Sequence, residues 1–274
     1  MKYTDIIVEK KGPVAWLTLN KPRVYNAMGR QTLTEILAAL EDTANDPAIT
    51  VLVIRGAGNN FCTGMDVKEG ISPGGPGAEE FTRLADKVFL GVKKYPKVTI
   101  SVVKGYCMAG GLELALCCDL MIAEDNAKIG DGHIKLPGFV PNAGASVYLP
   151  RLIGVRKAKE ILLTGDFISG KEAERIGLAN RAAPAERLDQ EVDELVGKLV
   201  TNSPLGLKYM KMLIDKGVEC SIESALTLER TTLKMMVNTR EYKEAVTAMA
   251  RKRKPDPKSR QPRNTKNNTT KTKK

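Results

Sequence analysis

The chain has 274 residues, of which 42% are hydrophobic and 27% are charged, as expected for a globular protein with a sizeable core. No apolar run approaches the ~20 residues that span a membrane, and the N-terminus lacks the apolar stretch of a signal peptide. We therefore expect a cytoplasmic protein. Five cysteines without metal-ligand spacing and a single histidine predict reduced thiols and no metal site.

The formal net charge of +11 is concentrated at the C-terminus. Residues 251–274 hold eleven Lys or Arg and one acidic residue, so the first 250 residues carry a net charge of only +1. The segment 255–274 begins with two prolines and has no hydrophobic residue from 259 onward, which predicts a disordered basic tail. RNA binding through this tail is an alternative hypothesis. Nucleic acid is nevertheless not an expected partner, because no aromatic residue there could stack on a base.

In chain order, the first two thirds alternate short strands with helices. Strands are predicted at 6–10, 15–20, 50–55, 98–103, 120–123 and 128–130, and helices at 32–45, 79–94 and 110–118. This rhythm predicts an α/β fold with parallel strand pairing.

From residue 142 onward the pattern becomes mostly helical. Helices are predicted at 185–200, 203–216 and 221–250, and the last is rich in Met and Leu. So much apolar surface beyond the core predicts a partner subunit. The alternative is that these apolar residues pack against the same subunit. We divide the chain into an α/β core at 1–200, a helical oligomerisation region at 201–254 and the tail at 255–274.

The segment 101–119 carries the clearest chemical signal. An apolar run predicts a buried strand, Gly110 and Gly111 follow where a helix should begin, and the helix then carries a carboxylate, Glu113. The first N–H groups of a helix lack intrahelical partners and can stabilise an oxyanion. An oxyanion site beside a carboxylate suits thioester enolate chemistry. A tight strand–helix turn with an ordinary helix glutamate is the structural alternative.

A second segment has the same plan. Residues 50–56 predict a buried strand that runs into a Gly/Asn-rich turn and reaches Asp66, a candidate helix N-cap. Two strand–glycine–helix units could place two backbone donors around one carbonyl oxygen.

Four motifs carry a resemblance to a known family. They are Phe-Cys-Thr-Gly-Met-Asp at 61–66, Gly-Tyr-Cys-Met-Ala-Gly-Gly-Leu-Glu-Leu-Ala at 105–115, Leu-Pro-Arg-Leu-Ile-Gly at 149–154 and Leu-Thr-Gly-Asp-Phe-Ile-Ser at 163–169. In this order and spacing the chain resembles the crotonase superfamily, also called the enoyl-CoA hydratase/isomerase family. The resemblance implies a spiral of ββα units in place of a doubly wound sheet. It also implies a C-terminal helical region that forms trimers or dimers of trimers.

The resemblance also implies site residues. The family's two oxyanion donors match the N–H groups of Met65 and Gly110. Its hydratases use two glutamates twenty positions apart: the first matches Glu113, but His133 stands at the second position. His133 could replace the glutamate, since an ordinary pKa of about 6.5 suits proton transfer. Asp131 could act instead, or Glu113 could act alone with a water. Alternatively, His133 has no catalytic role and its imidazole is a structural group hydrogen-bonded to the backbone.

The coenzyme A moiety is expected to lie along two loops. The candidate substrate- and CoA-binding residues are Arg23, Val24, Cys62, Gly64, Asp66 and Gly111. Coenzyme A is part of the substrate, so no separate cofactor and no metal are expected.

The leading functional hypothesis is an enoyl-CoA hydratase, in which Glu113 activates water for addition at the β-carbon of an α,β-unsaturated acyl-CoA. Isomerisation, hydrolysis and decarboxylation of a CoA thioester are the alternatives within the superfamily. The expected partners are the acyl-CoA substrate and further copies of the chain, with no membrane association.

Overall fold

The computed structural model describes residues 3–70 and 77–256. The chain forms two compact units, unit 1 (Met1–Thr201) and unit 2 (Asn202–Lys274). The predicted basic tail lies, from residue 257 onward, outside the described residues. Within the described ranges, no helix is long and apolar enough to cross a membrane.

Unit 1 is built on a six-stranded sheet with the order β1-β2-β3-β4-β6-β8. Strands β1 and β2 form an antiparallel hairpin, and each later neighbour is parallel. Strands β5 and β7 form a second, parallel pair. The strands are β1 Ile6–Lys11, β2 Val14–Leu19, β3 Val51–Gly56, β4 Val98–Val103, β5 Tyr106–Met108, β6 Leu120–Glu124, β7 Lys128–Gly130 and β8 Arg181–Ala183.

The strand order distinguishes the spiral from a doubly wound sheet. Each strand of the main sheet adds beside the preceding one in chain order, without the reversal that creates a switch point in doubly wound folds. Strand β4 is buried at all six positions, as expected for a parallel strand covered on both faces. The prediction of a ββα spiral is therefore confirmed.

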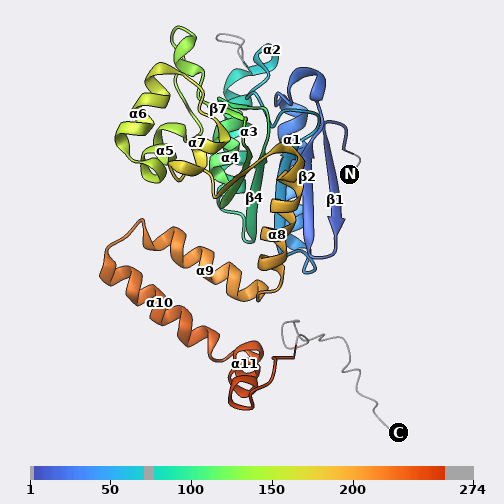
Figure 1. Cartoon of the computed structure of the whole chain (residues 1–274), viewed down its shortest axis with the longest axis vertical. Coiled ribbons are helices and arrows are strands. Elements are labelled where there is room, and N and C mark those ends of the chain that lie inside the picture. Colours follow the sequence, from blue (N-terminus) through green and yellow to red (C-terminus); the bar gives the residue numbers. More distant parts are fainter. Residues whose placement is uncertain (1–2, 71–76, 257–274) are drawn as a thin grey trace. The chain divides into compact units, whose positions relative to one another are not determined.

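The helices of unit 1 cover the sheet. Helix α1 buries Leu33, Ile36 and Leu40 on one face and packs against α3. Burial of each such side chain contributes roughly 1.5–3 kcal/mol. Helices α5, α6 and α7 gather on the side of unit 1 away from β1 and β2 (Figure 1). The helices are α1 Arg30–Asn45, α2 Val67–Gly70, α3 Ala78–Lys93, α4 Gly110–Cys117, α5 Ala145–Ile153, α6 Val155–Thr164, α7 Gly170–Arg175 and α8 Leu188–Val200.

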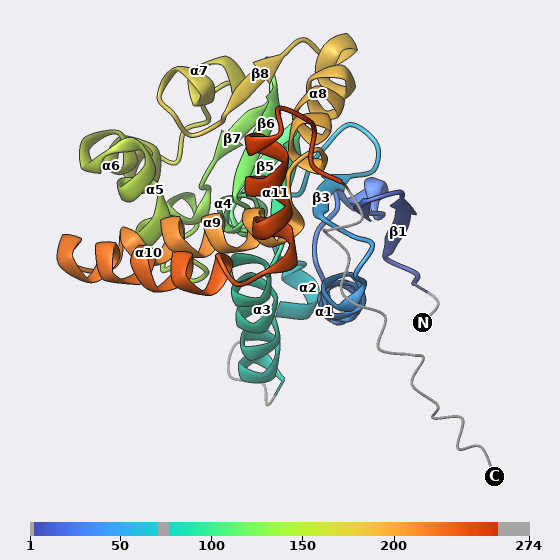
Figure 2. The same cartoon turned by 90° about the horizontal axis from the view of Figure 1, so that it is seen from below.

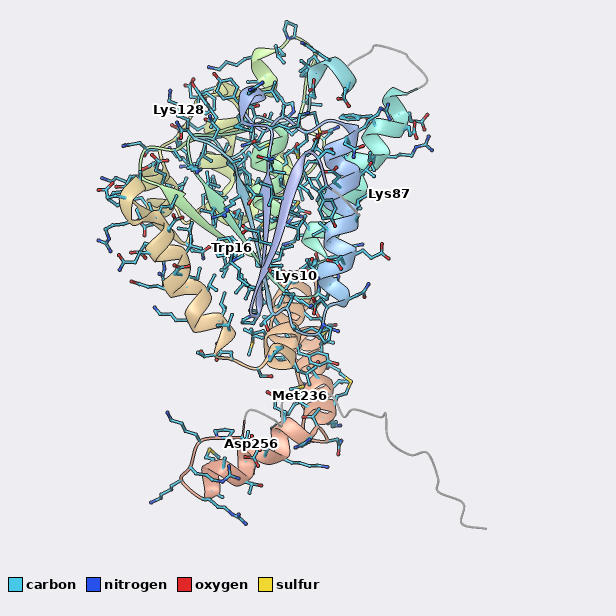
Figure 3. The ribbon with its side chains drawn as sticks, turned by 90° about the vertical axis from the view of Figure 1, so that its right-hand side faces the viewer. Lys10, Trp16, Lys87, Lys128, Met236 and Asp256 are labelled. Atoms are coloured by element: carbon cyan, nitrogen blue, oxygen red, sulfur yellow. The ribbon has the colours of Figure 1, made fainter. Side chains whose placement is uncertain are left out.

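Unit 2 contains α9 (Pro204–Gly217), α10 (Ile222–Met236) and α11 (Arg240–Ala250), coloured orange to red in Figure 2. Each helix is preceded by an N-cap residue whose side-chain hydroxyl accepts a backbone N–H of the first turn. The N-cap residues are Ser203, Ser221 and Thr239 respectively. The Thr239 cap starts a new helix, so the single helix predicted over 221–250 is two helices. Met236 marks the end of α10 in Figure 3.

Several short elements were not predicted, among them β5, β8 and the turn η2. Strands β5 and β8 have only three residues each, and their pairing partners β7 and β6 supply the hydrogen bonds that define them. The 3-10 turn η2 (His133–Lys135) follows β7 and has no buried residue. Periodicity needs longer segments, so local sequence could not identify them.

Candidate functional site

The first candidate oxyanion donor lies in the loop between β3 and α2. Gly64 takes a φ of +105°, which glycine adopts readily. On either side of Met65, Met28 N–H donates to the Gly64 carbonyl (2.8 Å) and Asp66 N–H donates to the Met28 carbonyl (2.9 Å). Among the described residues, the Met65 N–H itself has no acceptor.

The second donor begins α4. Ala109 has the unusual backbone angles φ +50° and ψ −126°, which turn the chain sharply from β5 into the helix. Such strain is frequently found at functional sites. Gly110 is the first helical residue, so its N–H has no intrahelical acceptor. A Cβ on Gly110 would lie 3.4 Å from Met65 N, and one on Gly64 would lie 3.1 Å from Gly110 N. The two predicted donors are thus neighbours.

Close backbone packing holds the two donor loops together. Cys62 and Cys107 form an isolated parallel bridge, in which Cys62 N–H donates to the Tyr106 carbonyl and Met108 N–H donates to the Cys62 carbonyl. A Cβ on Gly111 would lie only 2.1 Å from the Cys62 carbonyl oxygen. Gly111 is therefore required for close approach of the two loops.

Glu113 lies one turn into α4 and is 1% exposed. Its Oε1 accepts the backbone N–H groups of Ala143 (2.7 Å) and Ala145 (3.3 Å), which precede and begin α5. Burial raises the pKa of the Glu113 carboxyl, against the lowering effect of these two hydrogen bonds. Its Oε2 has no hydrogen-bond partner in the described part of the chain, yet is not among the fully enclosed oxygens. One carboxyl oxygen is therefore fixed by two hydrogen bonds, and the other has no such partner in the described residues.

Asp131 and His133 lie directly after β7. Asp131 Oδ1 accepts the His133 backbone N–H (2.9 Å) and contacts His133 Nδ1. The bond to Asp131 is the main cause that raises the pKa of His133, and the charge of Glu113 adds to it. The structure therefore brings all three candidate acid/base residues into one electrostatic neighbourhood.

The candidate CoA-binding residues fall into two adjoining loops. Arg23 and Val24 lie on the exposed 3-10 turn η1 (Pro22–Val24). The next residue, Tyr25, accepts the N–H of Thr63 (3.2 Å), so this turn contacts the first donor loop.

The other candidates have structural partners. Cys62 is fully buried, its Sγ donates to the Asn26 carbonyl, and burial raises its pKa to about 12. Asp66 Oδ1 accepts the Lys68 N–H (3.1 Å), the contact of a helix cap, and Asp66 pairs with Lys21 (3.8 Å). The Cys62 thiol is thus excluded from contact with substrate.

Sequence reasoning missed Asn26, which organises the first donor loop. Its buried Nδ2 lies within hydrogen-bond distance of the carbonyls of Ala57 (3.0 Å), Asn60 (2.8 Å) and Phe61 (3.1 Å). Its Oδ1 accepts the Lys21 N–H, and its φ is +58°. An asparagine in a loop was the available signal, because Asn tolerates the left-handed region and bonds backbone groups.

Comparison with known proteins identifies the family. Residues 9–260 match the family model described as enoyl-CoA hydratase/isomerase. The chain belongs to this family, the crotonase superfamily. It is 36% identical over 255 residues to the crotonyl-CoA hydratase of Syntrophomonas wolfei, covering 93% of this chain and 98% of that protein. It is 34% identical to the short-chain-enoyl-CoA hydratase of Clostridium acetobutylicum, with coverage of 93% and 97%.

Solved structures agree on the fold. The enoyl-CoA hydratase of Bacillus anthracis superposes with a TM-score of 0.87 at 29% identity, covering 92% of this chain and 98% of that one. The spiral of unit 1 and the helices of unit 2 are thus those of a crotonase-family enzyme. Membership in this family implies an acyl-CoA substrate.

Proposed function

We propose that the protein adds water to the double bond of an α,β-unsaturated acyl-CoA. Relatives that are 34–36% identical over 93% of this chain are named hydratases of crotonyl-CoA and of short-chain enoyl-CoA. The observation that carries the proposal is the environment of Glu113: a buried carboxylate with one oxygen held by two N–H groups and the other left open.

In the proposed reaction, Glu113 takes a proton from water as the oxygen adds to the β-carbon. Burial suits this role, because a carboxyl with a raised pKa is a stronger base than an exposed glutamate. The bonds from Ala143 and Ala145 fix the carboxylate, so little orientation has to be gained during the reaction.

The Met65 and Gly110 N–H groups are the proposed oxyanion hole. Addition at the β-carbon places negative charge on the thioester oxygen of the resulting enolate. Two preorganised backbone donors stabilise that charge, and each is worth about 3–4 kcal/mol in comparable sites. Backbone donors do not depend on side-chain chemistry, so a Met at position 65 is compatible with this role.

We assign the coenzyme A moiety to the two adjoining loops. Arg23 would contact a phosphate and Val24 the pantetheine, while carbonyls at Cys62 and Gly64 would face the adenine. Asp66 and Gly111 would shape the same surface. The reaction needs no separate cofactor or metal. A cytoplasmic location fits the five free thiols, four of which are buried.

The test is incubation of linear and cyclic enoyl-CoA and oxoacyl-CoA thioesters in ¹⁸O-labelled water, followed by mass spectrometry. A labelled hydroxyacyl-CoA is the expected product, and its formation should stop in Glu113→Gln but continue in Glu174→Gln, an exposed helix glutamate. A labelled free acid with released CoA would show that the protein is a thioester hydrolase and not a hydratase. Unlabelled, mass-neutral products would mean isomerisation, and loss of CO₂ would mean decarboxylation.

We further propose that unit 2 joins copies of this chain into a trimer or a dimer of trimers. Its helices expose large apolar side chains, which monomeric proteins rarely gather in one region. These are Met210, Ile214, Val218, Ile222, Leu226, Leu233, Met235, Tyr242, Val246 and Met249.

Light scattering after size-exclusion chromatography tests this assembly. The paired change of Ile214 and Met249 to Lys should reduce the mass to that of smaller species, whereas Lys243→Ala on α11 should leave it unchanged. A wild-type monomer, or an unchanged mass in the paired variant, would contradict the proposal.

A further inference from the structure

The side chains of Asp131 and His133 form a pair in which one carboxylate oxygen and one ring nitrogen face each other. Asp131 Oδ1 accepts the backbone N–H of His133 (2.9 Å) and also contacts the ring at Nδ1. The Asp131 side chain is 2% exposed and that of His133 is 16% exposed. Because Nδ1 faces a carboxylate, it carries a hydrogen, and Nε2 is the nitrogen left for other chemistry.

Burying the Asp131 carboxylate costs folding free energy. Its Oδ2 is enclosed and is one of the few buried side-chain oxygens in the described residues without a hydrogen-bond partner. A buried carboxylate is tolerated where a cation or strong donors compensate it, and the His133 ring is the group that faces it. A buried polar atom without a hydrogen-bond partner needs an explanation, and a catalytic role is one such explanation.

The topology places this pair beside the proposed oxyanion hole. Strands β5 and β7 run parallel with Met108 opposite Gly130, and Ala109 N–H donates to the Gly130 carbonyl (3.3 Å). Gly110 and Asp131 therefore follow the carboxyl ends of neighbouring strands. The charges of His133 and Asp131 both act on the pKa of Glu113, so the pair also lies near the proposed base.

We propose that His133 donates the proton to the α-carbon of the enoyl thioester from Nε2, and that Asp131 is a positioning residue that holds the ring by Nδ1. This inference rests on the proposed hydration. In this hydration, Glu113 is the first proton-transfer group and a histidine, not a second glutamate, is the other. Among the described residues, no group bonds to Nε2, so the proton there is free to move.

The proton balance closes. One O–H bond of water breaks: its oxygen bonds to the β-carbon and its proton goes to the Glu113 carboxylate. The Nε2–H bond breaks, and that proton bonds to the α-carbon as the enolate collapses. His133 is left neutral and Glu113 protonated, and proton exchange through solvent restores both before the next turnover.

The charged groups that face His133 favour the imidazolium form of its ring. Asp131 comes from the segment after β7 and Glu113 from α4, and both raise the pKa of His133, while burial opposes them. Lys135 on the same turn pairs with Asp166 (3.0 Å). Removing the Asp131 charge should therefore lower the pKa of His133 and shift the alkaline limb of the kcat profile to lower pH.

The experiment uses the full chain with ¹⁵N-labelled histidine, which gives one imidazole signal set because the chain contains a single histidine. In Asp131→Asn, the midpoint of the imidazole titration and the alkaline limb of kcat should both move to lower pH. Asp166→Asn, an exposed carboxylate that pairs with the same turn, should move neither. An unmoved titration in Asp131→Asn would overturn the positioning role.

The proton transfer itself is tested with His133→Gln. Its kcat for hydration should fall about 10²–10⁴-fold, measured on protein that thermal unfolding shows to be folded at the assay temperature. In D₂O, exchange of the α-hydrogens of a saturated acyl-CoA should be lost as well. Full hydration and exchange by His133→Gln would overturn the inference while leaving the proposed function intact. Exchange that depends on His133 without hydration of any thioester would instead overturn the proposed function, and would keep His133 only as a group that exchanges a proton with the α-carbon.

Discussion

Two turns of unit 1 follow neighbouring parallel strands, yet they are built in opposite ways. The turn after β5 (residues 109–113) is buried and depends on backbone atoms, with glycines packed against the Cys62 loop. The turn after β7 (residues 131–135) is partly exposed and is fixed by one side-chain pair. The first turn should therefore be sensitive to an added Cβ, and the second to the chemical identity of its side chains.

The largest effect is expected at the one chemically active side chain of the first turn. Glu113→Gln should lower kcat about 10²–10⁴-fold with a small change in KM, because the variant loses a base used in the transition state. The amide oxygen can still accept from Ala143 and Ala145, so thermal unfolding should be little affected. Steady-state hydration kinetics measure the loss, and an unchanged kcat would remove Glu113 from the mechanism.

The next largest effect concerns the support of the first donor loop. Asn26→Ala should destabilise the fold by about 1–3 kcal/mol for each buried group left unpaired, lowering the melting temperature by roughly 2–4 °C per kcal/mol. Asn26→Gly is the matched control, since it keeps the positive φ and removes only the amide. Equal stability of Asn26→Gly and the wild type would show that the amide contacts contribute nothing.

A pair of glycine substitutions sharpens the contrast between the turns. A Cβ on Gly111 meets the Cys62 carbonyl oxygen at 2.1 Å, whereas one on Gly132 meets the flexible end of Met108 at 3.0 Å. Gly111→Ala should therefore cost about 1–3 kcal/mol, as overpacking does, and Gly132→Ala much less. Denaturant unfolding measures both, and equal costs would contradict the comparison.

The smallest effect is a pH dependence of stability. Because burial raises the pKa of Glu113, the folded state binds its proton more tightly than the unfolded state does. The contribution of Glu113 is thus fully present below its ordinary pKa of 4.5 and is lost as the pH rises through the raised value. The free energy of unfolding of the wild type minus that of Glu113→Gln should fall over this range. A rise over the same range would contradict the burial effect.

Most of the spiral was predictable from residue patterns, including the short strand β7, but other short elements were not. The strand at 98–103 and the helix start at Gly110 were found at the predicted residues, because each is a continuous apolar run or a clear boundary. Strand β5 has three residues and is defined by pairing with β7. The helix break at Thr239 is set by a single cap hydrogen bond, which a long apolar pattern obscures.

The sequence by itself determined the family, the spiral and the order of the candidate residues, because motifs and periodicity are local properties. It left three alternatives open for the second proton transfer: His133, Asp131, or Glu113 alone with a water. Only the tertiary structure joined Asp131 to His133 Nδ1, packed Asn26 under the first donor loop and brought the N–H groups of Ala143 and Ala145 to Glu113. These contacts involve backbone groups or orientations that residue type does not encode, and separations of up to 35 residues along the chain.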